Sequence, residues 1–212
     1  MTEKNKLVVA WIVENDEDVW KLSYESIKEV ADVTIVVDGN KEIGTTVNYP
    51  GADVTLHTPY PHEDKGADGK QRNKYIEYIK EHHPDAWVLV LDADEFVDNP
   101  QGILDTIAYC EENRFDVCSP NMRHYVSNLG FEDAERPKHF VNARLFKINP
   151  DMIYNEVEHP ALHNGKRGIE GSMFTVWHLG YAREVMRLYK KYKNHSAKSN
   201  IHSQEFLTQW YH

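Results

Sequence analysis

Two aspartates that follow a short apolar segment are the residues best suited to chemistry. Trp87–Leu91 contains only apolar residues and runs directly into Asp92-Ala93-Asp94. Such a segment predicts a strand buried on both faces, and open α/β sheets bind ligands at the carboxyl ends of their strands. Side chains of an extended chain alternate, so Asp92 and Asp94 are expected to point the same way. Two carboxylates placed together suit Mg²⁺ or Mn²⁺; the competing interpretation is a pair of solvated turn acids.

The first half of the sequence predicts the parallel strands that would position these acids. Apolar runs indicate strands, and apolar residues at helical spacing indicate helices between them. The first two strands and the helix between them form a strand-helix-strand unit with short connections, which predicts a right-handed parallel crossover. The pattern predicts a strand over residues 7–13, a helix over 15–31 with Asn15 as its N-cap, and strands over 33–37 and 52–57. A loop over 58–69 and a second helix over 70–83 follow.

The second half is predicted to mix strand directions. A helix opens with Asn99 as N-cap and Pro100 in its first turn. Two segments then alternate roughly with period 2, which predicts strands with one solvated face. These two strands are predicted over residues 117–126 and 139–148, and a surface loop over 127–138 separates them. A last strand over 169–177 and a basic helix over 182–197 follow. The whole is predicted to be one α/β domain, a mixed and mostly parallel central sheet flanked by helices.

Composition narrows the function classes. The chain has 212 residues, enough for one domain with a sizeable core, and a formal net charge of -10, which argues against a general nucleic-acid binder. No run approaches the ~18 apolar residues of a membrane span. The N-terminus shows no signal-peptide pattern, so a cytoplasmic location is expected. Cys110 and Cys118 lack metal-type spacing and are predicted to be free buried thiols.

One basic segment stands against the overall acidic charge. Its cations are Arg183, Arg187, Lys190, Lys191, Lys193 and Lys198. A solvated helix face is the ordinary explanation of such a run. The alternatives are contact with an anionic substrate or peripheral contact with a membrane surface.

Six segments together resemble one family. The sequence is similar to the nucleotide-sugar glycosyltransferases of family 2, and within it to small enzymes of the lipopolysaccharide-core type. The matching segments occur in the family's order, at 11–17 (WIVENDE), 36–39 (VVDG), 71–75 (QRNKY), 87–96 (WVLVLDADEF), 143–147 (ARLFK) and 178–183 (HLGYAR). The resemblance implies the GT-A fold, a Rossmann-like nucleotide-diphospho-sugar transferase architecture. Residues 1–98 would form the nucleotide-binding half, and residues 99–212 the acceptor-side half with the C-terminal helix.

The resemblance also implies roles for individual residues on the donor side. Asp38 would accept a hydrogen bond from the nucleotide base, and Arg72 would contact the base or diphosphate through its planar fork of donors. Ile12 and Ala93 join this nucleotide-binding set, and Arg144 would hold phosphate charge. The ordinary alternatives are a turn acid for Asp38 and a surface helix arginine for Arg72.

The metal site is implied in the same way. Asp94 would ligate Mn²⁺ or Mg²⁺ directly, Asp92 would lie near the ribose and the metal, and His178 would complete the site from far along the chain. The cation would offset charge on the departing nucleotide. A lone histidine at a strand end is otherwise most often a satisfied core or surface residue.

The catalytic base is where the sequence departs from the family. An inverting transferase needs a carboxylate to take the acceptor's hydroxyl proton. Relatives often carry His-Glu here, whereas residues 154–160 read YNEVEHP, with the order reversed and a proline in place of the acid. Glu158 is the first candidate, Glu156 would share its face in an extended chain, and Asp133 in the 127–138 loop is the third. Each is otherwise a solvated acid.

Three functions remain open from the sequence. The first is a metal-dependent, inverting transferase that moves a sugar from a nucleoside-diphosphate sugar, with a UDP-sugar favoured, to a glycan, lipid-linked or protein acceptor. The second is a phosphohydrolase of the haloacid-dehalogenase type, which wants Thr or Val where this chain has Phe96. The third is a non-catalytic module of the same fold that binds a sugar nucleotide or glycan.

Overall fold

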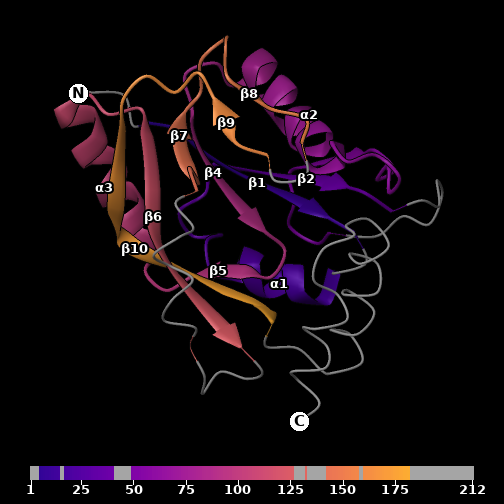
Figure 1. The fold of residues 1–212 in the computed structure, drawn as a ribbon. Coiled ribbons are helices and arrows are strands. Elements are labelled where there is room, and N and C mark those ends of the chain that lie inside the picture. The colour runs from indigo at the N-terminus through magenta and orange to yellow at the C-terminus, as the bar shows by residue number, and fades with distance from the viewer. Residues whose placement is uncertain are drawn as a thin grey trace.

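The computed structural model (Figure 1) describes residues 5–14, 17–40, 49–126, 132, 142–157 and 160–181. In that part of the chain the elements are, in order, β1 (Leu7–Val13), α1 (Glu17–Glu25), β2 (Val33–Asp38), β3 (Val54–His57), α2 (Ala67–His82), β4 (Trp87–Asp92), β5 (Glu95–Val97), α3 (Pro100–Asn113), β6 (Val117–Val126), β7 (Leu145–Lys147), β8 (Ile153–Tyr154), β9 (Leu162–His163) and β10 (Gly168–Tyr181).

The main sheet confirms the predicted α/β class. Its strand order is β3-β2-β1-β4-β7-β6-β10-β5. Strands β1 to β4 pair in parallel, β7 runs antiparallel to both of its neighbours, and β5 runs antiparallel to β10. Strands β6 and β10 are parallel to each other. A parallel first half therefore precedes a mixed second half, as the change from continuous apolar runs to alternating segments predicts.

Helices cover both faces of this sheet. Alternate residues of β1 face opposite sides, as in any strand. Leu7, Val9 and Trp11 lie in one buried cluster with residues of α1 and α3, while Val8 and Ala10 lie in another with residues of α2 and β8. Burial on both faces explains why β1 and β4 are apolar at nearly every position. The site predicted around Asp92 and Asp94 should therefore lie at the carboxyl ends of these central strands.

Several element boundaries differ from the sequence prediction. Helix α2 begins at Ala67, inside the segment predicted as a loop, and the predicted 139–148 strand is reduced among its described residues to β7. Strand β5 and the β8–β9 hairpin were not predicted, because elements of two or three residues leave no periodic signal. Strand β10 is longer than predicted, and Gly171, with a φ of 89°, lies where its register against β6 shifts.

Other local predictions are confirmed. Asn99 caps α3, because its Oδ1 accepts a hydrogen bond from the Gly102 amide at 3.2 Å. Cys110 and Cys118 are buried and free. In the described part of the chain, no helix combines the length and apolar character that a membrane crossing requires. The Asn15 cap, the basic segment 183–198 and nearly all of the 127–138 loop fall outside the described residues.

Candidate functional site

A cavity of about 260 Å³ opens at the carboxyl ends of β1, β2 and β4. Helix α2, the segment that precedes it and strand β10 supply further lining residues. Its lining residues are Ile12, Val13, Glu14, Val37, Gly39, Tyr60, Asp68, Gln71, Arg72, Asp92, Ala93, Asp94 and His178. The structure thus brings together six of the residues that the sequence predicts for donor and metal binding: Ile12, Arg72, Asp92, Ala93, Asp94 and His178. Their roles remain predictions.

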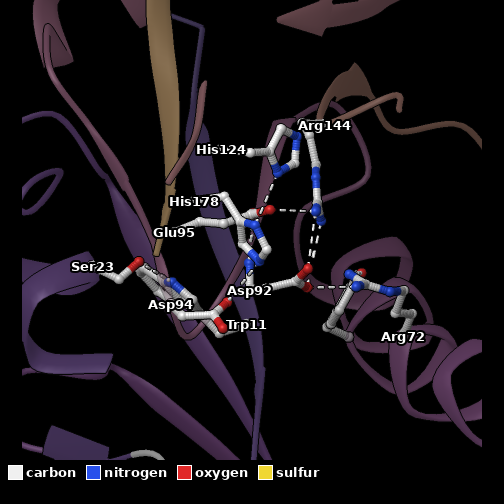
Figure 2. Close-up of polar contacts among 10 residues, drawn as sticks. Trp11, Ser23, Arg72, Asp92, Asp94, Glu95, His124, Arg144 and His178 are labelled. Carbon is white, nitrogen blue, oxygen red and sulfur yellow. Dashed lines mark hydrogen bonds and ion pairs between the residues drawn. The ribbon is translucent and has the colours of Figure 1, made fainter. Parts of the chain in front are cut away.

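Asp92 is held by two arginines. Arg72 Nη2 donates to its Oδ1 at 2.5 Å, and Arg144 Nη2 donates to its Oδ2 at 2.9 Å (Figure 2). Burial opposes ionisation of Asp92, but the Arg144 and Arg72 charges outweigh it and hold the pKa of this carboxyl well below its usual range. Both oxygens of Asp92 are therefore engaged by guanidinium groups, and Asp92 is a poor candidate for a direct metal ligand.

Glu95 completes this charged cluster and was missed by the sequence analysis. Its Oε1 accepts from Arg144 Nη2 at 2.6 Å, and its Oε2 accepts from the Asp92 backbone amide at 2.9 Å. Burial raises the pKa of Glu95 to about 8, although the Arg144 charge acts in the opposite direction. The only sequence signal was an acid placed directly after the Asp92-Ala93-Asp94 segment and before apolar residues.

Arg144 was predicted to hold phosphate charge, and the structure gives it a different set of contacts. Its side chain is 8% exposed, pairs with Asp92 and Glu95, and does not belong to the cavity lining. These contacts make Arg144 a structural partner of Asp92. Contact with a phosphate remains an untested prediction.

Asp94 contacts a different part of the molecule from Asp92. Strand β4 ends at Asp92, and Ala93-Asp94 forms a turn, so the alternation of an extended chain does not continue through both acids. Asp94 Oδ1 lies 3.6 Å from His178 Nε2, and the Asp94 carbonyl accepts from the Leu179 amide at 2.8 Å. The two acids border one cavity, but Asp94 faces β10 whereas Asp92 faces the arginines (Figure 2).

Gly180 permits this close approach. A Cβ at this position would lie 2.5 Å from His178 Nε2 and 2.9 Å from Asp94 Oδ2. No side chain fits there without moving one of the two groups. The glycine of the His178-Leu179-Gly180 segment therefore allows the histidine to lie against the acid.

Asp94 and His178 fit a divalent cation better than Asp92 does. They offer one carboxylate and one imidazole on the wall of the cavity, and Mn²⁺ or Mg²⁺ bound with phosphates needs only one or two protein carboxylates. Among the described residues there is no group of three or more His, Cys, Asp or Glu that would hold a metal unaided. Oxygens of a bound ligand would have to supply further positions.

Asp38 is buried and supports the end of β2. Its Oδ1 accepts from Tyr49 Oη and from the Asn40 amide, both at 3.1 Å, and its Oδ2 lies 2.9 Å from His57 Nδ1. The neighbouring Val37 and Gly39 line the cavity, whereas Asp38 does not. These contacts fix the strand end, and recognition of a base by Asp38 stays a prediction.

Two more acids on the cavity wall were not predicted as site residues. Glu14 Oε1 lies 2.5 Å from His62 Nε2, and Asp68 accepts a hydrogen bond from Tyr60. Burial, together with the Asp68 contact, raises the pKa of Tyr60. Glu14 and Gln71 belong to the segments that carried the family resemblance, which was the signal available for them.

The base candidates are placed less completely. Glu156 is exposed, lies 3.8 Å from Lys70 Nζ and is not part of the cavity lining. Glu158 and Asp133 lie outside the described residues. The chain just before Glu156 is fixed to α2, because Asn73 donates to the Tyr154 carbonyl at 2.9 Å and accepts from its amide at 2.8 Å.

Comparison with known proteins gives partial structural similarities. No protein-family model and no curated protein matches this sequence. The chain is similar to two structures of S. aureus TarS: one of residues 1-349, with 22% identity and a TM-score of 0.41, covering 56% of this chain and 36% of that chain; the other with 17% identity and a TM-score of 0.48, covering 71% and 30%. A mannose-1-phosphate geranyltransferase from Thermus thermophilus matches with 15% identity and a TM-score of 0.28, covering 59% and 42%. This chain therefore spans less than half of each of these structures, and similarity at this level assigns no family.

Proposed function

We propose that the protein is a metal-dependent, inverting glycosyltransferase that uses a nucleoside-diphosphate sugar, with a UDP-sugar favoured, and a glycan, lipid-linked or protein acceptor. One observation carries the proposal: Asp94, in the turn after β4, and His178 from β10 face each other at 3.6 Å on a cavity that also contains Arg72. The location at the carboxyl ends of parallel strands and the six sequence segments support the same conclusion.

Different residues of the cavity would bind different parts of the donor. Asp94 and His178 would hold Mn²⁺ or Mg²⁺, which when bound offsets charge on the diphosphate leaving group. Arg72 presents a guanidinium to the same cavity, and its pairing with Asp92 fixes its direction before a ligand arrives. Such preorganised donors stabilise developing negative charge without a reorganisation cost at the moment of reaction. Ile12 and Val37 give the cavity apolar walls that a nucleotide base can contact.

The acceptor proton requires a carboxylate on the other side of the sugar. Glu158 is the proposed base, with Glu156 and Asp133 as the alternatives. Residues 155–156 pack directly on α2, since a Cβ at Gly69 would lie 2.1 Å from the Asn155 carbonyl oxygen. This packing ties residues 155–156, which lie just before Glu158 in the sequence, to the helix that carries Arg72. Glu158→Gln should abolish transfer while donor binding is kept; intact transfer would exclude Glu158.

The phosphohydrolase alternative fits the site poorly. That chemistry needs the first aspartate, Asp92, as a nucleophile, but both of its oxygens accept hydrogen bonds from guanidinium groups. A carboxylate with its charge neutralised in this way is a weak nucleophile. Phe96, at the position where that family wants Thr or Val, packs its ring 5.6 Å from that of Trp177.

Calorimetric titration of UDP, in Mn²⁺ and then in EDTA, tests the proposal. Mn²⁺-dependent binding is expected for the wild-type protein and should be lost in Asp94→Ala. Asp85→Ala is the matched control, because Asp85 is an exposed aspartate just before the opposite end of β4. Absence of metal-dependent UDP binding would contradict the proposal. A hydrolysis screen of UDP-, GDP- and dTDP-sugars then identifies the donor, and binding without hydrolysis or transfer would favour the non-catalytic module.

A further inference from the structure

We infer that His124 is a positioning residue for His178, holding the ring so that its Nε2 lone pair is available to a divalent cation beside Asp94. The inference rests on the proposed metal-dependent function and deepens it. His124 was not among the residues that the sequence singled out.

The two histidines are brought together by strand pairing. Strands β6 and β10 run in parallel, and His124 is the register partner of His178. The two Nδ1 atoms lie 3.0 Å apart, and the rings meet edge to face with centroids 5.0 Å apart. His124 is 5% exposed, so its ring is held by the surrounding structure. Figure 2 shows His178 between His124 on one side and Asp94 on the other.

The contact between the two Nδ1 atoms constrains where the protons lie. A hydrogen bond between two ring nitrogens needs one N–H donor and one lone pair. When a cation occupies Nε2 of His178, the ring proton must be on Nδ1, and His124 Nδ1 is then the acceptor that it meets. Histidine ligands commonly donate their second ring N–H to such a partner, which fixes both tautomer and ring orientation.

Gly180 restricts the same ring from another side. A Cβ built there would lie within 2.6 Å of both His178 Nε2 and Cε1. His178 therefore lies between the Gly180 backbone, Asp94 and His124. The His124 side chain meets Nδ1 of His178 at hydrogen-bond distance.

Two variants separate positioning from packing. His124→Leu removes the acceptor but keeps an apolar group of moderate size, whereas His124→Asn places an amide oxygen near the former Nδ1 position. The full chain, stripped of metal, is titrated with Mn²⁺ alone, and free Mn²⁺ is measured by electron paramagnetic resonance. We expect His124→Leu to bind Mn²⁺ about 10-fold or more weakly than the wild-type protein, as is typical when the partner behind a ligand is lost. His124→Asn should keep most of the affinity.

A second measurement does not depend on metal. In ¹⁵N-labelled protein, the Nδ1 atoms of His124 and His178 should show a coupling across their hydrogen bond, and His124→Leu should lose it. Absence of this coupling in the wild-type protein would overturn the inference. So would wild-type Mn²⁺ affinity in His124→Leu, an equal loss of affinity in both variants at unchanged melting temperature, or no Mn²⁺ binding by the wild-type protein.

These outcomes also separate the inference from the proposed function. If Mn²⁺ binds in a way that depends on His124 but UDP never binds, the proposed function fails and the positioning role stands. If UDP binds with Mn²⁺ and His124→Leu leaves the Mn²⁺ affinity unchanged, the proposed function stands and the positioning role fails.

Discussion

Two groups of charged and polar side chains, each partly on the cavity wall and partly behind it, are built in different ways. The arginine side consists of Asp92, Glu95, Arg72 and Arg144, with nitrogen–oxygen distances between 2.5 and 2.9 Å in its closest contacts. The histidine side consists of Asp94, His178 and His124, and its Asp94–His178 contact is 3.6 Å, longer than a hydrogen bond. Close, charge-assisted hydrogen bonds fix the arginine side, whereas the longer contact on the histidine side is the geometry that the proposed cation would need to bind both groups.

This difference indicates separate duties for two acids that are two residues apart in sequence. Asp92 belongs to a network in which it is paired with both Arg72 and Arg144, and Arg144 also contacts the buried Glu95, so the loss of Asp92 should be felt by the whole fold. Asp94 lies at a turn on the cavity wall, so its loss should be felt by the ligand. Stability and binding measurements on matched variants therefore test whether the two sides are in fact distinct.

Removal of Arg144 should have the largest effect. Arg144→Met would leave the Asp92 and Glu95 carboxylates without their shared cation, and breaking a buried pair in this way costs about 3–5 kcal/mol. Urea unfolding should show this loss. Arg123→Met is the matched control, because Arg123 is half exposed on β6, and it should lose less than about 1 kcal/mol. Equal stability of the two variants would mean that the arginine side is not a structural network.

Asp94→Asn should have the opposite outcome to Arg144→Met, with ligand binding lost and stability kept. The side chain keeps its size but loses the charge that a cation needs, so Mn²⁺-dependent UDP binding should fall by more than the about 10- to 100-fold typical of losing a residue behind a ligand. Its urea midpoint should stay close to that of the wild-type protein. Calorimetry and unfolding on the same preparation make the comparison. A variant that unfolds easily but still binds UDP normally would place Asp94 on the structural side.

Glu95 predicts a pH dependence of stability that originates on the arginine side. Its pKa is raised from 4.5 to about 8, so between these values the folded state holds a proton that the unfolded state has released. Stability should therefore fall as the pH rises through this window, with a slope of at most about 1.4 kcal/mol per pH unit from this group. Urea unfolding between pH 5 and 8 should show a shallower slope for Glu95→Gln. An unchanged slope would assign the dependence to other groups.

The sequence predicts the strand ends and the residues next to them, but not the contacts that strand pairing creates. The ends of β1, β2, β4 and β6 match the predicted runs closely, because burial on one or both faces is recorded locally in each strand. Asp92, Asp94 and His178 were found because they end or follow such runs. His124 was not, because its contact with His178 depends on the pairing of strands that lie 54 residues apart.

Arg72 and Arg144 were named as site residues from the family resemblance, but their pairing with Asp92 was not predicted, for the same reason. Arg144 meets Asp92 across 52 residues, through β7, of which only three residues have strand geometry. A charged residue that precedes so short a strand resembles any surface arginine in the sequence. Local periodicity can therefore locate the end of a strand, but the charges that face it come from tertiary pairing.

Gly180→Ala should have the smallest effect, and it tests the histidine side alone. The added methyl group must displace His178 or Asp94, since its Cβ would lie 2.5 Å from Nε2 and 2.9 Å from Oδ2. His178 borders the cavity and has room to yield, so the loss of stability should be near the lower end for overpacking, about 1 kcal/mol.

Mn²⁺ affinity should fall in the same variant, because the displaced ring no longer faces Asp94. Gly168→Ala on the same strand is the control, as its Cβ would come no closer than 3.7 Å to any neighbour. Mn²⁺ titration and thermal melting of both variants decide the outcome. If Gly180→Ala binds Mn²⁺ as well as Gly168→Ala does, the close approach of His178 to Asp94 is not what holds a cation. The two sides of the cavity would then differ in rigidity without differing in function.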